Sequence, residues 1–243
     1  MSATVDFSFH ATRVGFFMLL HIPQVLDAPQ VQQIQQQLAG ADWQDGTRSS
    51  GAQATQVKRN HQLPTTLAIY PALTAQILQA LQQHSLFQSA ALPKQILPIL
   101  FNRYQQQEQY GNHVDSALQR HPMSGLQVRT DLSVTLFLSD ANSYDGGELV
   151  IEDLYGTHEV KLDAGDAIVY PSTSLHRVEA VTAGQRLAAV TWVQSLVKDN
   201  WQRDMLFQLD MTILKLRQQL GDHPEVVALT QHYHNLLRQW IEV

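Results

Sequence analysis

Two histidines and an aspartate are the residues whose types and spacing most directly suggest chemistry. His113 and Asp115 stand two positions apart, and His176 follows much later in the chain. In an extended segment, side chains two positions apart point to the same face, so His113 and Asp115 could bind one ligand. Two imidazoles and one carboxylate are the ligand set of non-haem Fe(II) oxygenases, which leaves half of an octahedral metal open. The alternative is that the His-x-Asp pair arose by chance and that His176 is a core or surface histidine.

Arg186 stands ten residues beyond His176 and suggests a second ligand contact. The pattern predicts a hairpin in which His176 begins one strand, residues 182–185 form the turn and Arg186 begins the return strand. Five residues of strand span about 16 Å, which leaves room for a short dicarboxylate between the two side chains. One end of that acid would chelate the metal, and the other would meet the guanidinium fork. The alternative for Arg186 is a surface charge beside a turn.

Composition narrows the class of protein. The chain has 243 residues, of which 44% are hydrophobic and 16% charged, so it suits a packed domain of moderate size better than a disordered chain. A formal charge of −6 and an acidic stretch over residues 139–166 disfavour nucleic acid as a partner. The absence of cysteine excludes disulfides and thiol nucleophiles and makes the cytoplasm the expected location. No apolar run reaches the ~18–20 residues that span a bilayer, so we expect no membrane partner.

Residues 1–95 are expected to form two parts. Residues 1–17 lack sustained periodicity and form an N-terminal extension whose order the sequence leaves open. Residues 18–95 form an α/β part that packs on the core. Within it, Asp27 and Gln30 have the spacing of a capping box and begin an amphipathic helix, and residues 73–81 repeat apolar side chains at helical spacing.

Residues 96–243 are expected to form a β core followed by a helical region. Turn signals divide residues 96–195 into short segments rich in branched and aromatic side chains, which predicts an antiparallel sandwich or jelly roll. Residues 196–243 predict a helical hairpin, with Gly221 ending the first helix and residues 222–225 opening the second like a capping box. The expected strands are residues 96–104, 134–138, 149–151, 158–162, 167–170, 177–181 and 187–193.

Longer motifs link these patterns to a known family. The segments that carry the resemblance are His113-x-Asp115, Asp145-Gly-Gly-Glu-Leu149, Ala164-Gly-Asp166-Ala-Ile-Val-Tyr170-Pro, His176-x-Val, Arg186, Leu97-Pro-Ile-Leu-Phe-Asn-Arg-Tyr104, Arg129-Thr-Asp-Leu-Ser-Val-Thr-Leu-Phe-Leu-Ser139, Gly221-Asp-His-Pro-Glu-Val and Tyr233-His-Asn-Leu-Leu-Arg238. Together they resemble the prolyl-4-hydroxylase-like branch of the Fe(II)/2-oxoglutarate-dependent dioxygenases. They are most similar to the bacterial PKHD-type hydroxylases, a group associated with iron uptake. The resemblance covers about residues 18–243.

The resemblance implies a fold, a reaction and a set of site residues. The fold would be α+β, with a double-stranded β-helix (jelly-roll) core, flanking helices and a C-terminal helical hairpin. The enzyme would hydroxylate a substrate with 2-oxoglutarate and O₂ and release succinate and CO₂. His113, Asp115 and His176 would be the ligands of Fe(II), and Arg186 would anchor 2-oxoglutarate. Tyr104 would also contact the co-substrate, its alternative being a half-buried strand aromatic. L-ascorbate is suggested as an accessory reductant.

Several alternatives stay open on the sequence. The prime substrate could be a prolyl residue, a free amino acid or a siderophore-like molecule, and the leucine-rich faces of the terminal hairpin leave a homodimer open. A non-catalytic, cupin-like module that binds a metal or small molecule is one other class. An AlkB-like nucleic-acid demethylase is another, and the net charge disfavours it. Further pocket candidates, not separable from structural residues, are Asn102, Arg129 and Trp192.

Overall fold

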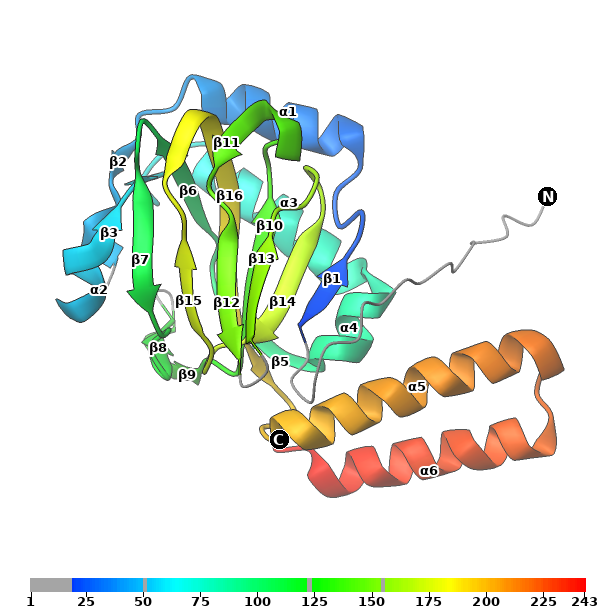
Figure 1. Cartoon of the computed structure of the whole chain (residues 1–243). Coiled ribbons are helices and arrows are strands. Elements are labelled where there is room, and N and C mark those ends of the chain that lie inside the picture. Colours follow the sequence, from blue (N-terminus) through cyan, green and yellow to red (C-terminus); the bar gives the residue numbers. More distant parts are fainter. Residues whose placement is uncertain (1–18, 50–51, 122–123, 154–155) are drawn as a thin grey trace.

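Two antiparallel β-sheets that face each other form the centre of the molecule (Figure 1). This computed structural model describes residues 19–49, 52–121, 124–153 and 156–243, so the expected extension over residues 1–17 lies outside the described residues. The strands of the larger sheet are, in spatial order, β1 (Leu20–Ile22), β14 (Ala167–Pro171), β10 (Leu132–Phe137), β16 (Val181–Ser195), β6 (Leu100–Gln105), β4 (His61–Gln62) and β2 (Gln44–Asp45), with β5 (Pro93–Ile96) and β11 (Tyr144–Gly146) also paired to β16. The smaller sheet runs β13 (Gly156–Val160), β12 (Leu149–Asp153), β15 (Leu175–Val178), β7 (Gln109–His113) and β3 (Lys58–Arg59), and β8 (Leu118–Arg120) pairs with β9 (Gln127–Arg129) in a separate hairpin.

The central strands of the larger sheet are buried on both faces. On β10, Leu132, Val134 and Leu136 pack under the helices, whereas Ser133 and Thr135 point the other way, into the space between the sheets. This alternation follows from the two-residue period of a strand. A second apolar cluster, with residues from both sheets, closes part of that space. The side chains that could carry chemistry therefore come from the inner faces of the two sheets.

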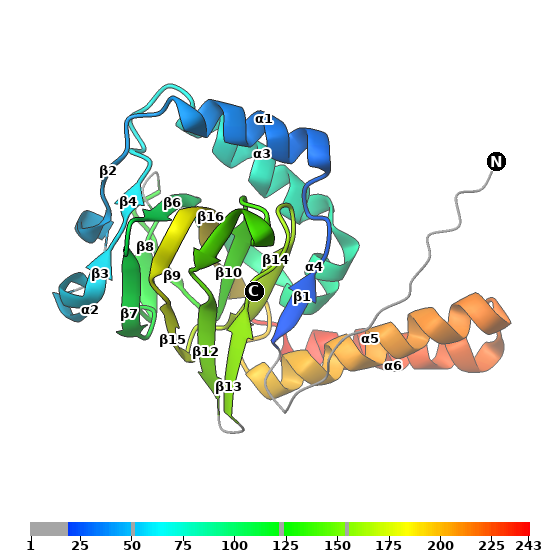
Figure 2. The same cartoon turned by 45° about the horizontal axis from the view of Figure 1, so that its top comes forward.

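Helices cover the outer face of the larger sheet (Figure 2). In α1 (Ala28–Ala39), the Asp27 carboxylate accepts the Gln30 backbone N–H at 2.8 Å and the Gln30 side chain accepts the Asp27 N–H at 2.9 Å, so the expected capping box is confirmed. The expected second helix is α3 (Tyr70–Gln83). The sequence did not predict α2 (Ala52–Val57), α4 (Ser85–Ala91) or the 3₁₀ turns η1 (Gly46–Ser49) and η2 (Ala141–Ser143).

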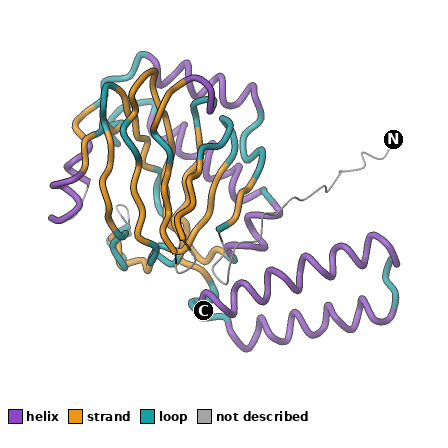
Figure 3. The backbone as a smooth tube through the Cα atoms, viewed as in Figure 1, coloured by secondary structure: helices purple, strands orange, loops and turns teal. Residues whose placement is uncertain are grey.

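The chain ends in a helical hairpin that projects from the β core (Figure 3). Its helices are α5 (Asn200–Leu220) and α6 (Pro224–Trp240), and Gly221 ends the first with φ 63°, as expected. The capping box expected at residues 222–225 is wrong. Because Pro224 is the first residue of α6, the N-cap is His223, which makes no side-chain capping bond, and Asp222 instead pairs with Arg217 at 3.2 Å. Within the described ranges, no helix has both the length and the apolar character needed to cross a membrane.

The hairpin expected between His176 and Arg186 does not form. His176 lies on β15, which pairs with β12 and β7 in the smaller sheet, whereas Arg186 lies on β16 in the larger sheet. Residues 182–185 are part of β16. Gly184, which suggested a turn, has φ 71° where β16 passes β11, and a Cβ there would lie 2.4 Å from the Ser143 carbonyl oxygen. The glycine thus permits a close approach between strands and not a chain reversal.

Most other expected strands are present with shifted ends. The exception is the single strand expected over residues 96–104, which is two strands, β5 and β6. Pro98 lies between them and has no backbone N–H to donate to a ladder, so it interrupts the pairing.

Candidate metal and co-substrate site

His113, Asp115 and His176 lie together at one end of the smaller sheet. His113 is the last residue of β7 and stands directly opposite His176 on the neighbouring β15, while Asp115 follows two residues later in the loop. Potential ligand atoms of the three side chains all lie within 4.8 Å of one another. The two histidines are 5% and 4% exposed, so the cluster is sheltered from bulk solvent.

Backbone carbonyl groups fix the orientation of both imidazoles. Nδ1 of His113 is 2.9 Å from the Gly111 carbonyl oxygen, and Nδ1 of His176 is 3.0 Å from that of Ser174. A carbonyl oxygen only accepts, so each Nδ1 carries the proton and each Nε2 keeps a free lone pair. Burial is the main reason that the pKa of His113 falls to about 4, so its ring is neutral and able to ligate at neutral pH.

Serine hydroxyls hold the carboxylate of the cluster. Ser133 Oγ donates to Asp115 Oδ2 at 2.6 Å and lies 2.8 Å from Ser172 Oγ. The bonded Asp115 oxygen is 3.8 Å from His176 Nε2. Two imidazole nitrogens and a carboxylate are a donor set that suits ferrous ion. Each of the three side chains is also oriented by a hydrogen bond to a neighbouring residue, so the described residues fit a bound ferrous ion.

Aromatic rings surround the histidines. The Tyr110 ring stacks on His113 with centroids 3.6 Å apart, and Tyr170 meets His176 edge-on at 5.2 Å. The Lys58 ammonium lies 5.1 Å from the centroid of the Tyr110 ring. These contacts limit how far either imidazole can rotate.

Arg186 lies on the opposite sheet, in the wall of the same cavity. The cavity has a volume of about 440 Å³ and is lined by His113, Asp115, His176, Arg186 and Tyr104, among others. Arg186 is the register partner of Tyr104 on β6, and its guanidinium carbon is 5.3 Å from the Tyr104 and Phe137 ring centroids. The side chain is 1% exposed.

The guanidinium of Arg186 is incompletely satisfied. Its Nε and Nη2 atoms have no hydrogen-bond partner, and no carboxylate of the described residues forms an ion pair with it. A buried charge without a partner is costly, so the arrangement suits an anionic ligand that supplies the missing acceptors. Burial raises the pKa of Tyr104 to about 12, so its hydroxyl stays protonated at neutral pH and can donate a hydrogen bond.

The site residues expected from the sequence therefore meet in one cavity. Asn102 and Trp192 also line it. Arg129 does not, because its guanidinium pairs with Asp131 at 2.6 Å and with Glu242 at 2.8 Å. Sequence reasoning missed Lys58, Ser133 and Tyr170. Of these, only Ser133 had a usable signal: a polar residue that alternates with the apolar residues of β10.

Comparison with known proteins shows to which class of enzyme this protein belongs. Residues 99–194 match the model of the 2OG-Fe(II) oxygenase superfamily, and residues 200–242 match the PKHD-type hydroxylase C-terminal domain. The fold resembles a 2OG-Fe(II) oxygenase family oxidoreductase from Burkholderia pseudomallei, with a TM-score of 0.50 and 18% identity over 75% of this chain and 85% of that one. HygX of Streptomyces hygroscopicus, solved with nickel and 2-oxoglutarate, matches with a TM-score of 0.50 and 14% identity over 74% of this chain and 84% of that one. The expected jelly-roll fold is confirmed, and the protein is an Fe(II)- and 2-oxoglutarate-dependent dioxygenase.

A curated relative defines the family more narrowly. A PKHD-type hydroxylase from Hyphomonas neptunium is 59% identical over 225 residues, which cover 93% of this chain and 100% of the relative. The chain belongs to the PKHD-type hydroxylase family. It is an enzyme that uses Fe(II), 2-oxoglutarate and O₂ to hydroxylate a substrate.

Proposed function

We propose that His113, Asp115 and His176 hold the ferrous ion, and that Arg186 and Tyr104 bind 2-oxoglutarate. The observation that carries the proposal is the convergence of the three ligands within 4.8 Å of one another in the same cavity as a buried guanidinium with unpaired nitrogens. A non-catalytic, cupin-like site with a closed metal would not require an unpaired guanidinium in the same cavity. A neutral imidazole at each histidine and a carboxylate at Asp115 are the protonation states that ligation needs.

The chemistry follows from that placement. When bound, Fe(II) supplies the activation of O₂ that couples decarboxylation of 2-oxoglutarate to oxidation of a C–H bond, with one oxygen atom ending in succinate and the other in the alcohol product. The chain contributes orientation. The Gly111 and Ser174 carbonyl groups hold the imidazoles, Ser133 holds Asp115, and Arg186 fixes the far carboxylate of the diacid.

The substrate, the reductant, the cellular location and the oligomeric state of the enzyme belong to the same proposal. The prime substrate is a prolyl residue, an amino acid or a siderophore-like molecule, with L-ascorbate as accessory reductant and no role for nucleic acid or membrane. The absence of cysteine supports a cytoplasmic enzyme. Exposed apolar side chains on the terminal hairpin, such as Trp201 and Met205, support a homodimer. The chain divides into an N-terminal extension over residues 1–17, an α/β part over residues 18–95, the jelly-roll core over residues 96–195 and the C-terminal helical region over residues 196–243.

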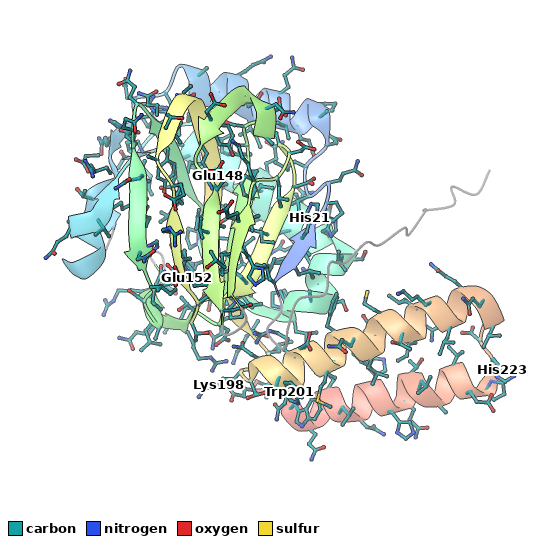
Figure 4. The ribbon with its side chains drawn as sticks, viewed as in Figure 1. His21, Glu148, Glu152, Lys198, Trp201 and His223 are labelled. Carbon is teal, nitrogen blue, oxygen red and sulfur yellow. The ribbon has the colours of Figure 1, made fainter. Side chains whose placement is uncertain are left out.

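Anaerobic titration with Fe(II) and 2-oxoglutarate, followed by visible absorption, tests the site. Wild type should give a charge-transfer band, and alanine at His113, Asp115 or His176 should abolish stoichiometric iron binding in a protein that is still folded by circular dichroism. His223→Ala, at the tip of the helical hairpin (Figure 4), is the matched control and should bind iron normally. Full iron occupancy in any of the three variants would remove that residue from the ligand set.

A further inference from the structure

Tyr144 lies beside Arg186 at the closed end of the cavity. It belongs to β11, which pairs with the first residues of β16, and it stands opposite Gly184 in that pairing. β11 lies at one end of the two sheets (Figure 1), whereas the exposed residues of the cavity wall lie on β8 and the loop before it, at the other end. The Tyr144 side chain is 3% exposed and packs in the same apolar cluster as Tyr104 and Phe137, the two rings next to the guanidinium.

Neighbouring groups fix the position of Tyr144. The Lys161 ammonium donates to the backbone carbonyl groups of Tyr144 at 2.9 Å and Gly146 at 3.1 Å, and it lies 4.2 Å from the centroid of the Tyr144 ring. Gly147 has φ 68°, and a Cβ there would lie 3.0 Å from both Tyr144 Cε2 and Arg186 Cδ. The tyrosine ring and the aliphatic part of the arginine therefore border the same glycine, which places the hydroxyl and the guanidinium in one layer of the interior.

The Tyr144 hydroxyl has no acceptor for its hydrogen. Its oxygen is buried and forms no well-aligned hydrogen bond with the described residues. Burial raises the pKa of Tyr144, which keeps the hydroxyl protonated, although the charge of the adjacent Arg186 opposes the rise. An arginine only donates, so its contact with the tyrosine oxygen leaves the hydroxyl hydrogen unpaired. The charge of Glu148 also acts on Tyr144, but its carboxylate pairs with Lys161 at 3.5 Å.

Unpaired donors therefore gather at the closed end of the cavity. Nε and Nη2 of Arg186 and Oη of Tyr144 are buried, and none of them has a hydrogen-bond partner among the described residues. Buried donors without acceptors cost free energy, so a group of them beside a cavity indicates a ligand that is rich in acceptors. A carboxylate has two oxygens with about four lone-pair sites, which is enough for the guanidinium fork and a hydroxyl together.

We propose that the Tyr144 hydroxyl donates a hydrogen bond to the far carboxylate of 2-oxoglutarate, the one that pairs with Arg186, and that this contact helps the site to select a dicarboxylate. The inference rests on the proposed function, because it takes Arg186 to be the anchor of 2-oxoglutarate. A site built to hydrogen-bond a polar group rejects an analogue that lacks the group, because buried donors are then left unpaired. Tyr144 is thus a specificity-determining residue for the co-substrate.

2-Oxopentanoate is the probe that isolates this contact, because it keeps the chain of 2-oxoglutarate and carries a methyl group in place of the far carboxylate. Protein loaded anaerobically with Fe(II) is titrated with each acid, and the charge-transfer band is followed. In Tyr144→Phe the affinity for 2-oxoglutarate should fall at least about tenfold, since a hydrogen bond to a charged group is commonly worth a roughly ten- to hundredfold change in affinity. The affinity for 2-oxopentanoate should stay as in wild type, so the preference for the dicarboxylate falls by the same factor.

Further variants separate this contact from other roles of the tyrosine. Tyr144→Phe keeps the ring beside Lys161, so its melting temperature and Fe(II) affinity should stay close to those of wild type. Tyr70→Phe is the matched control, because it removes a buried hydroxyl that donates to the Ile99 carbonyl oxygen at 2.9 Å in the helix-covered cluster, and it should leave both affinities unchanged. In the Arg186→Lys background, Tyr144→Phe should again weaken 2-oxoglutarate binding, because the hydroxyl meets the carboxylate directly.

Three results would overturn the inference. Unchanged binding of 2-oxoglutarate by Tyr144→Phe would show that the hydroxyl makes no contact with the co-substrate. An equal loss of affinity for both acids would assign the tyrosine to the shape of the cavity, and the absence of a further loss in the Arg186→Lys background would make it a support of the arginine alone. Absence of the band from wild type with 2-oxoglutarate would refute the proposed function instead, so the two failures are distinguishable.

Discussion

Truncation of Arg186 should separate co-substrate binding from metal binding. The guanidinium carbon lies 5.3 Å from the ring centroids of both Tyr104 and Phe137, and the side chain comes from the sheet opposite His113 and His176. Arg186→Ala should therefore leave Fe(II) binding intact. It should abolish 2-oxoglutarate-dependent succinate formation at ordinary co-substrate concentrations, because the far carboxylate loses its cation.

The structure sets the size of the loss. Removal of one partner of a buried, hydrogen-bonded charge pair costs about 2–5 kcal/mol, which is roughly thirty- to several-thousand-fold in affinity. Nε and Nη2 of Arg186 are both unpaired, so the fork can meet a carboxylate with two parallel hydrogen bonds, and the upper half of that range is expected. Arg186→Lys should recover only part of the affinity, because a point charge cannot reproduce the fork.

The assay is the anaerobic titration of iron-loaded protein with 2-oxoglutarate at one ionic strength, with iron content measured on the same samples. Arg238→Ala, on α6, removes an exposed arginine and serves as the control. If Arg186→Ala binds 2-oxoglutarate as tightly as wild type, the anchor lies elsewhere and this account of the cavity is wrong. That result would leave the proposal for His113, Asp115 and His176 as iron ligands untouched.

Other substitutions test the supporting structure. Ser133→Ala removes the 2.6 Å hydrogen bond to Asp115 and should weaken Fe(II) binding about ten- to hundredfold in a metal titration; unchanged affinity would show that the serine does not support the ligand. At Gly147, with φ 68°, an added Cβ would lie 2.8 Å from Val181 Cγ2 and 3.0 Å from Arg186 Cδ, so Gly147→Ala should displace the arginine side chain and raise the Kd for 2-oxoglutarate about tenfold, which is about 1.4 kcal/mol of binding free energy. A Kd equal to that of wild type would mean that the arginine tolerates the methyl group. Asp27→Ala should lower the free energy of unfolding by about 1 kcal/mol in urea denaturation, with no change in iron binding, and a stability equal to wild type would exclude a capping role.

Local features of this protein could be predicted from the sequence because neighbouring residues determine them. The capping box at Asp27 and Gln30 involves atoms three residues apart, and the helix that follows buries residues at helical spacing. The same holds for His113 and Asp115, whose separation of two residues keeps them close together, the first at the end of β7 and the second in the loop that follows. The motifs around them indicated the family, which the relatives confirm.

Only the tertiary structure decided how the two halves of the site face each other. The sequence predicted one hairpin for His176 and Arg186, but the chain crosses between sheets after β15 and places them on opposite walls. Gly184 misled the prediction because its positive φ accommodates the Ser143 carbonyl of another strand, a contact between residues far apart in the chain. Local propensity carries no information about such a contact.

Lys58 shows the same limit for a residue of the cavity wall. In the sequence it is one basic residue in a polar stretch, with no motif around it. It lines the cavity because β3 pairs with β7, and that pairing brings its ammonium over the Tyr110 ring. The residue types of the proposed iron ligands could be read from the sequence, but their convergence depends on the pairing of β7 with β15. The charge that surrounds them depends on strand pairing across the whole chain, which only the folded structure provides.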